Sequence, residues 1–205
     1  MSGSIRPLLV AAALSLAGGC AFLEPRADPT RYYVLTPVVE SGERVQAVGV
    51  HLSLGPVELP SYLDRPEIVS RPAPHRLDVT ASDRWAEPLP SAFARVLRQN
   101  LVVLLGPDAI VDFPSTAAAR DTREYVLDVD VLRFEASGPE RVELAARWTL
   151  RDARTRTTVV ARETTVARPV RSSDRAAGAA AALSECVGDL SRDISRALAL
   201  ASQPH

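Results

Sequence analysis

Few side chains in this 205-residue sequence have the types and spacing that catalysis or metal binding requires. Asp128 and Asp130 lie two residues apart in an alternating segment, so they share one strand face and could act as an acid–base pair. A solvated strand face explains the two carboxylates more simply. The histidines, His51, His75 and His205, lack metal-ligand spacing. We therefore expect no catalytic residue, no metal site and no enzyme activity.

Composition excludes mechanisms that depend on lysine. All 24 basic residues are arginine, so neither a Schiff base nor a phosphate-binding loop with its lysine is possible. The sequence also has no Gly-x-Ser-x-Gly elbow and no His-Glu-x-x-His pair. A net charge of −1 argues against a protein built for nonspecific nucleic-acid binding. The 46% hydrophobic and 24% charged residues are typical of a globular protein.

One predicted hairpin is rich in arginine and could meet phosphate headgroups. Acidic residues are interleaved with the basic ones, which favours an ordinary mixed, solvated surface. The arginines are Arg147, Arg151, Arg154, Arg156 and Arg162, and the acidic residues are Glu143, Asp152 and Glu163.

The N-terminal segment combines a processing signal with a cysteine. After Arg6 come an apolar run over 8–16, small residues over 17–19, and Cys20. The apolar run is too short to span a bilayer and is typical of a secretory signal. Residues 16–20 resemble the lipobox of bacterial lipoproteins, although Ala17 stands where leucine is commonest. The alternative is an ordinary cleaved signal that happens to precede a cysteine.

The lipobox resemblance implies that the thiol of Cys20 receives diacylglycerol, that cleavage falls between Gly19 and Cys20, and that the new amine is acylated. More than one acyl chain gives stable anchoring without a membrane span. Ala21 rather than aspartate follows, which by resemblance to enterobacterial lipoproteins implies the outer membrane of a Gram-negative cell, facing the periplasm. We expect no cofactor beyond these acyl chains. Cys186 then has no disulfide partner, and on a predicted helix it is expected to be a buried, inert thiol.

The sequence predicts three segments along the chain. Residues 1–19 form the signal peptide. Residues 20–30 contain the lipidated cysteine and a flexible tether, because two prolines and alternating polar residues favour an extended linker. Residues 31–205 form a single globular domain.

Alternation of apolar and polar residues predicts most of the elements of this domain as strands. The cleanest is 141–150, where every second residue is apolar. Residues 58–66 are expected to form a loop or a single turn, and 115–121 a connection. The remaining strands are expected at 31–35, 45–57, 68–71, 75–79, 109–113, 125–134 and 157–166.

Two segments have helical periodicity instead. One covers about 88–105, with proline near its start and glycine after its end. The other covers about 174–201, with Ser173 or Asp174 as its cap. Strands followed by helix, then strands followed by helix, predict an α/β (α+β) fold: a two-layer sandwich with two helices on one face of a largely antiparallel sheet.

Two loops have the residue types of an interface. Tyr62, Leu63 and Arg65 lie in a proline-bounded segment, and Trp85 lies just before the first helix. Aromatic, leucine and arginine residues on rigid loops are typical anchors of protein contacts. We expect these four residues to contact a partner or another copy of the chain. The alternative, which is compatible with contact, is that Tyr62 and Trp85 fold back onto the core.

These loops also carry a resemblance to a known family. The chain is similar to the PqiC (YmbA-like) lipoproteins, also described as ABC-type transport auxiliary lipoproteins and membrane integrity-associated transporter subunits. The similarity covers most of residues 20–200. Over residues 107–170 only the pattern of apolar and polar residues matches. The matching segments are Cys20, 32–35, 57–69 and 84–89, followed by Leu97, Asn100 and Leu101.

The resemblance implies a role in trans-envelope lipid transport. Such a lipoprotein accompanies an inner-membrane complex whose MCE-domain protein builds a tunnel across the periplasm. The lipoprotein would dock the tunnel at the outer membrane and form a ring-like homo-oligomer. One alternative is a periplasmic hydrolase, for which the sequence has no motif. Another is a monomeric envelope lipoprotein that binds a small ligand or assists assembly of another envelope machine.

Overall fold

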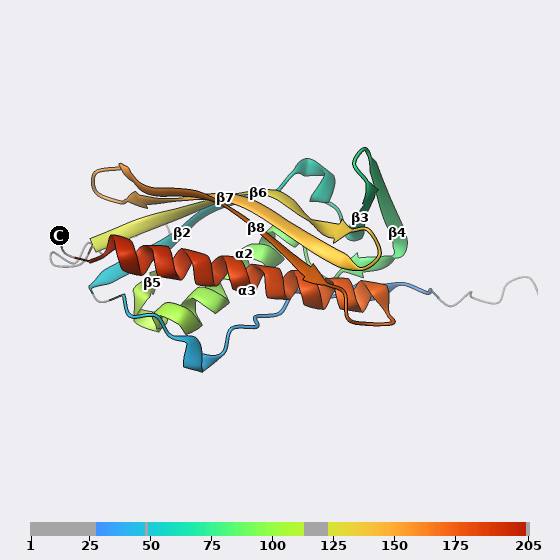
Figure 1. Ribbon diagram of the computed structural model, residues 1–205, viewed down its shortest axis with the longest axis horizontal. Helices are drawn as coiled ribbons and strands as arrows, with labels where there is room; N and C mark the ends of the chain where they lie inside the picture. The colour runs from blue at the N-terminus through green and yellow to red at the C-terminus, as the bar shows by residue number, and fades with distance from the viewer. Residues whose placement is uncertain (1–27, 48, 113–122, 204–205) are drawn as a thin grey trace, which may run out of the picture.

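The computed structural model describes residues 28–47, 49–112 and 123–203, and these form one mixed sheet with two helices on one of its faces (Figure 1). This arrangement confirms the predicted fold class. The described strands are β1 (Arg31–Tyr33), β2 (Val50–Glu58), β3 (Glu67–Ala73), β4 (Arg76–Trp85), β5 (Ile110–Val111), β6 (Arg123–Ser137), β7 (Arg141–Asp152) and β8 (Thr158–Pro169). The helices are α2 (Leu89–Leu105) and α3 (Arg175–Ala201), with short 3-10 turns η2 (Ser41–Glu43), η3 (Ser61–Leu63) and η4 (Pro107–Ala109).

Strand β6 is the centre of the sheet. Along one edge its first half pairs in parallel with β2, and its last residues pair in parallel with β3. Along the other edge it pairs with β7, and β7 with β8, both antiparallel over eleven residue pairs. The longest pairings are therefore antiparallel, as expected. Strand β2 instead runs parallel to β6, because the chain between them includes helix α2, which returns the polypeptide to the end of the sheet where β2 began.

The helices bury the faces that their periodicity predicted. In α2 the buried stripe includes Phe93 and Leu97, and in α3 it includes Val187 and Leu190. Phe93 meets Phe134 of β6 edge-on, with ring centroids 5.2 Å apart and an interplanar angle of 80°. The α2 stripe and the sheet thus share one core, into which β7 adds its apolar side: Val142, Leu144, Ala146, Trp148 and Leu150.

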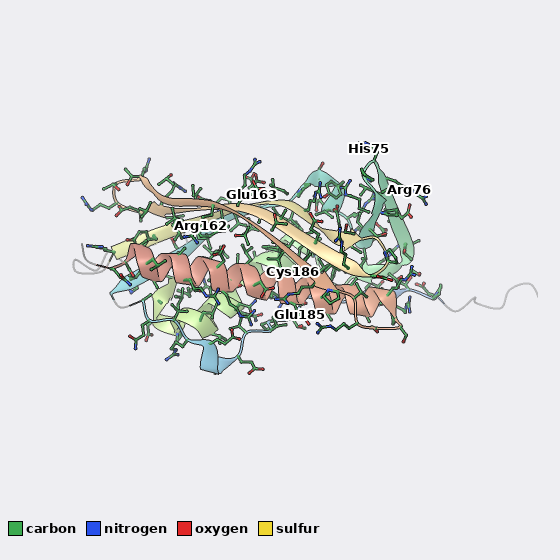
Figure 2. The ribbon with its side chains drawn as sticks, in the orientation of Figure 1. His75, Arg76, Arg162, Glu163, Glu185 and Cys186 are labelled. Atoms are coloured by element: carbon green, nitrogen blue, oxygen red, sulfur yellow. The ribbon has the colours of Figure 1, made fainter. Side chains whose placement is uncertain are left out.

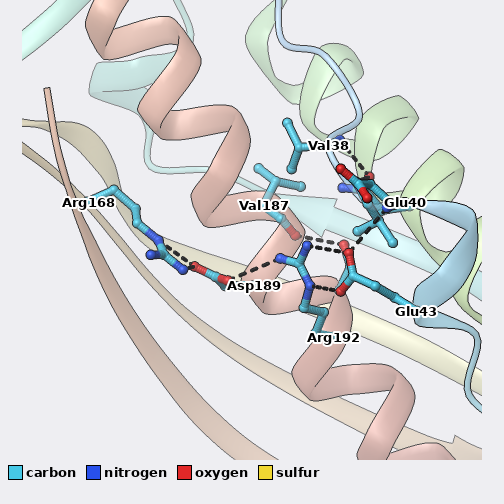
Figure 3. A network of polar contacts seen from close by, with 10 residues as sticks. Val38, Glu40, Glu43, Arg168, Val187, Asp189 and Arg192 are labelled. Atoms are coloured by element: carbon cyan, nitrogen blue, oxygen red, sulfur yellow. Dashed lines mark hydrogen bonds and ion pairs between the residues drawn. The ribbon is translucent and has the colours of Figure 1, made fainter. Parts of the chain in front are cut away.

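Helix α3 is held in place by its cap and by a polar network. The Asp174 side chain accepts hydrogen bonds from the backbone of Ala176 and Ala177, as predicted for a cap at this position. Halfway along α3, the Arg192 guanidinium donates to Glu43 of η2 at 2.5 and 2.9 Å and to Asp189 at 3.2 Å (Figure 3). Figure 3 also shows Arg168 of β8 bound to Asp189. These charges join α3 to η2 on one side and to β8 on the other.

Several strand boundaries differ from the sequence prediction. The strand expected from residue 45 begins at Val50, and Ser41–Glu43 form a 3-10 turn before it. The strand expected at 75–79 continues to Trp85 because β1 pairs in parallel with its last three residues. That pairing joins residues more than fifty positions apart, so local alternation does not reveal it. The predicted connection at 115–121 lies outside the described residues.

Substitutions at Phe93, which contacts Phe134, test how much the packing of α2 on the sheet stabilises the fold. We expect Phe93→Ala to lower the free energy of unfolding by about 3–5 kcal/mol, because it removes a fully buried ring and leaves a cavity. Phe93→Leu, which keeps most of the volume, should cost less than about 1.5 kcal/mol. Urea unfolding followed by circular dichroism measures both values, and equal losses for the two variants would contradict this packing.

Candidate functional site

The structure places the four predicted contact residues around the start of the β3–β4 hairpin. Leu63 and Trp85 are buried in the core, Tyr62 is half-buried, and Arg65 keeps 45% of its side chain exposed. The backbone N–H of Trp85 donates to the carbonyl of Pro66 at 2.6 Å, so the two segments are joined directly. Trp85 is the last residue of β4 rather than part of a free loop. Tyr62 and Trp85 therefore fold back as the alternative interpretation had it, while contact with a partner stays a prediction.

Tyr62 belongs to a buried polar cluster that the sequence analysis missed. Its phenol donates a 2.6 Å hydrogen bond to Oε2 of Glu135, whose side chain is 0% exposed. Arg71 of β3 donates to the other oxygen of Glu135, and its guanidinium carbon lies 5.4 Å from the Tyr62 ring centroid. The alternation of β6 gives Glu135 the appearance of a surface residue, and its partners are 64 and 73 positions away. Because the glutamate, the arginine and the tyrosine lie on three separate elements, no local sequence motif reveals the cluster.

This cluster fixes η3 against the outer face of the sheet, which is the face away from the helices. A buried carboxylate must be paired, because an isolated charge in the interior is strongly unfavourable. Glu135 is paired with a guanidinium and a phenol at once. Burial, and next the hydrogen bond to Glu135, raise the pKa of Tyr62 to about 12. The phenol therefore stays protonated and can donate across the physiological pH range.

The outer face of the hairpin exposes apolar side chains next to this cluster. Val79 of β4 pairs with Val69 of β3, and strand alternation places Arg71 on the same face as Val69. Leu77 lies two residues from Val79, so it shares this face too. Tyr32 of β1 pairs with Arg84 of β4 farther along. We call this region the hairpin surface, defined by the partly exposed residues Tyr32, Tyr62, Arg65, Leu77 and Val79.

The inner face of the same hairpin lines an open cleft of about 370 Å³ against the start of α3. Ile68 and Ala176 are among its apolar walls. Its acidic groups are already neutralised, since Asp78 is paired with Arg76 at 2.8 Å and Asp83 with Arg31 at 2.7 Å. The cleft can accommodate a small amphipathic molecule, but it brings together no nucleophile and base.

The acidic and basic residues of β6–β8 form ion pairs instead of a reactive site. Asp128 binds Arg151 at 2.6 Å, which explains this carboxylate without acid–base catalysis. Arg147 binds Glu163 at 3.0 Å. Arg162, which Figure 2 labels beside Glu163, binds Asp193 of α3 at 3.3 Å. The arginine-rich hairpin is a mixed, paired surface at these positions.

The remaining candidates for chemistry give no reactive centre in the described part of the chain. Cys186 is fully buried, as expected, and burial raises the pKa of its thiol to about 12, which disfavours the reactive thiolate. Residues 28–47, 49–112 and 123–203 include no group of three or more histidine, cysteine or acidic residues placed to hold a metal ion. Within the same ranges no helix is both long and apolar enough to cross a membrane. Gly19, Cys20 and the signal peptide lie outside the described residues.

Comparison with known proteins gives a family and a fold. The family model described as "ABC-type transport auxiliary lipoprotein component" matches residues 33–195. A crystal structure of a Xanthomonas campestris protein of family DUF330 is similar with a TM-score of 0.68 and 24% identity, covering 82% of this chain and 96% of that one. The crystal structure of an uncharacterized protein is similar with a TM-score of 0.63 and 18% identity, covering 82% and 97%. The comparison with curated proteins finds no match.

The buried cluster predicts that two arginines of the same hairpin differ strongly in how much they contribute to the free energy of unfolding. We expect Arg71→Ala to lower the free energy of unfolding by about 3 kcal/mol, because it leaves the buried Glu135 carboxylate without its cation. Arg76→Ala breaks only an exposed pair and should cost less than about 1 kcal/mol. Adding Glu135→Gln to Arg71→Ala should recover part of the loss. Similar losses for both single variants in urea unfolding would contradict a buried charge at Glu135.

The raised pKa of Tyr62 predicts how the stability of the folded protein changes at alkaline pH. The folded protein holds this proton more tightly than the unfolded chain, whose tyrosines titrate near 10. The resulting stabilisation is present below pH 10 and is lost as the pH rises toward 12. Ultraviolet titration should therefore show a tyrosine component near pH 12 that is lost in Tyr62→Phe. Burial also raises the pKa of Tyr33, so the titration of Tyr33 should be the same in both proteins. An unchanged component near pH 12 in Tyr62→Phe would contradict the assignment.

Proposed function

The chain belongs to the family of ABC-type transport auxiliary lipoprotein components, and on this premise we propose that it is the outer-membrane docking subunit of an MCE-type lipid-transport system. The observation that carries the proposal is the family match over residues 33–195 together with a lipid-attachment signal at Cys20. A transport auxiliary component assists the passage of substrate and has no bond to break itself. The absence of a nucleophile–base pair in the described residues is compatible with that role.

In this proposal the lipid anchor holds the domain at the periplasmic surface of the outer membrane. The acyl chains on Cys20 enter the bilayer, and residues 21–30 link them to the domain. The MCE-domain tunnel protein of an inner-membrane complex docks on a ring of several copies of this chain. An ATPase elsewhere in the system supplies the energy.

The loop around η3 is the proposed contact region. Arg65 and the exposed edge of Tyr62 lie on its surface, where they can reach a partner or a second copy. Leu63 and Trp85 act from beneath, because their burial fixes the loop in one conformation. A loop held rigid before binding loses little conformational entropy on contact. The cluster at Glu135 has the same effect on Tyr62.

A second candidate function is a monomeric envelope lipoprotein that binds a small ligand or assists assembly of another envelope machine. The cleft between the β3–β4 hairpin and α3, about 370 Å³ in volume, favours the ligand-binding form of this role. Native mass separates the two candidates. A ring of several copies supports the docking subunit, and a stable monomer supports the ligand-binding lipoprotein.

Cross-linking in intact cells tests the docking role. We expect the tagged, lipidated protein to recover an MCE-domain protein, identified by mass spectrometry. We expect Cys20→Ala to leave the membrane fraction and to lose this partner, because the domain is no longer held at the bilayer. Recovery of other envelope machinery with no MCE-domain protein would contradict the proposal, as would membrane retention of Cys20→Ala.

A charge-reversed pair of variants localises the contact. Arg65→Glu should reduce the recovered partner or disrupt the ring severalfold, because like charge is placed at the proposed contact. Arg154→Glu, in the exposed turn between β7 and β8, is the matched control and should leave recovery unchanged. Equal recovery with both variants, in folded protein, would remove η3 from the contact.

A further inference from the structure

Exposed apolar side chains gather at one end of the molecule. Among the described residues, six large apolar side chains are exposed, and four of these lie on β1, directly after it, or on β4. Three belong to the hairpin surface: Tyr32 is 64% exposed, Leu77 38% and Val79 41%. The two others, Val159 and Leu200, lie on β8 and at the C-terminal end of α3. An apolar group of this kind on a projecting element indicates contact with an apolar partner.

The β3–β4 hairpin presents these side chains outward. Asp78 and Thr80 line the cleft on its inner face, so alternation along β4 directs Leu77 and Val79 to the opposite face. The hairpin projects from the sheet at one end of the long axis (Figure 1), with His75 and Arg76 at its tip (Figure 2). The C-terminal end of α3 lies at the other end of that axis.

The polypeptide toward the predicted anchor leaves from the hairpin end. β1 pairs with the last residues of β4, and the described chain begins just before β1, at Asp28 (Figure 1). Residues 21–30 separate Cys20 from β1. Ten residues span at most about 35 Å when fully extended. A bilayer holding the acyl chains of Cys20 is therefore within reach of the hairpin.

The charges on the hairpin suit a lipid surface. On this face Arg71 is paired with Glu135, and Arg84 of β4 is paired with Glu67 of β3 at 3.6 Å, so the charges offset one another. Headgroups of either charge can approach such a surface. Tyrosine is a typical side chain of the membrane–water boundary, because its ring is apolar and its hydroxyl is polar. Tyr32, opposite Arg84 at the other end of β4 from Leu77 and Val79, supplies that group.

We propose that the outer face of the β3–β4 hairpin rests on the phospholipid bilayer, with Leu77 and Val79 at the acyl boundary. This inference rests on the proposed anchorage through Cys20 and adds an orientation to it: the hairpin end faces the membrane and the C-terminal end of α3 faces the periplasm. The η3 loop borders the hairpin on the same face. A partner docked at η3 would thus meet the bilayer directly.

Depth-dependent quenching tests this orientation in the full-length, lipidated protein. Leu77→Cys, Val79→Cys and the matched control Leu200→Cys carry an environment-sensitive fluorophore in vesicles of phosphatidylethanolamine and phosphatidylglycerol. Cys186 is buried and should take no label, which the unsubstituted protein checks. We expect a spin-labelled lipid to quench the fluorophore severalfold more at positions 77 and 79 than at 200.

Three other outcomes would overturn the inference. Equal or weaker lipid quenching at 77 and 79 than at 200, in protein that floats with the vesicles, removes the hairpin from the bilayer and leaves the anchor intact. Protection at 77 and 79 from aqueous iodide without lipid quenching assigns the surface to a second copy of the chain instead. Protein that does not float with the vesicles refutes the anchorage together with the orientation.

Discussion

The hydrogen bonding of β6 along both edges is the constraint on which the rest of the fold depends. One edge binds β7 over nearly its whole length, while the other is shared between β2 and β3. A strand in this position cannot shift by one residue without turning its apolar side chains out of the core. Its register therefore fixes the hairpin of β3 and β4 at one end of the sheet and β2 with β5 at the other.

The same strand supplies the charge that organises the candidate site. Glu135 lies near the end of β6, where the sheet passes from β2 to β3, and its carboxylate is covered by η3. Because a buried charge needs its partners, Arg71 and Tyr62 each have one favourable position. The loop that bears Arg65 is thereby positioned by an interaction beneath it. Arginine suits this task, since its planar guanidinium can bind a carboxylate and lie over an aromatic ring at once.

The two ends of the molecule differ in chemistry, and this difference relates the fold to the proposed function. One end combines the start of the described chain, the projecting hairpin and the η3 loop. Between the ends, α3 covers the sheet and is joined to η2 and β8 by ion pairs along its length. If the proposed anchorage and orientation hold, the hairpin end faces the membrane, and a fixed orientation would limit the positions that a docking partner must search.

The sequence by itself determined the family, the two helices with their buried stripes, the helix cap at Asp174 and the clean strand of β7, because each depends on residues within one or two turns or on simple alternation. The lipid-attachment signal predicted at Cys20 is also read from a linear motif, and it stays a prediction. Only the tertiary structure decided that β2 runs parallel to β6, that β4 extends to Trp85, and that Glu135 is buried beneath Tyr62. These features join residues fifty or more positions apart. Their energies come from pairing across the sheet and from neutralising a buried charge, and neither leaves a mark on the local pattern.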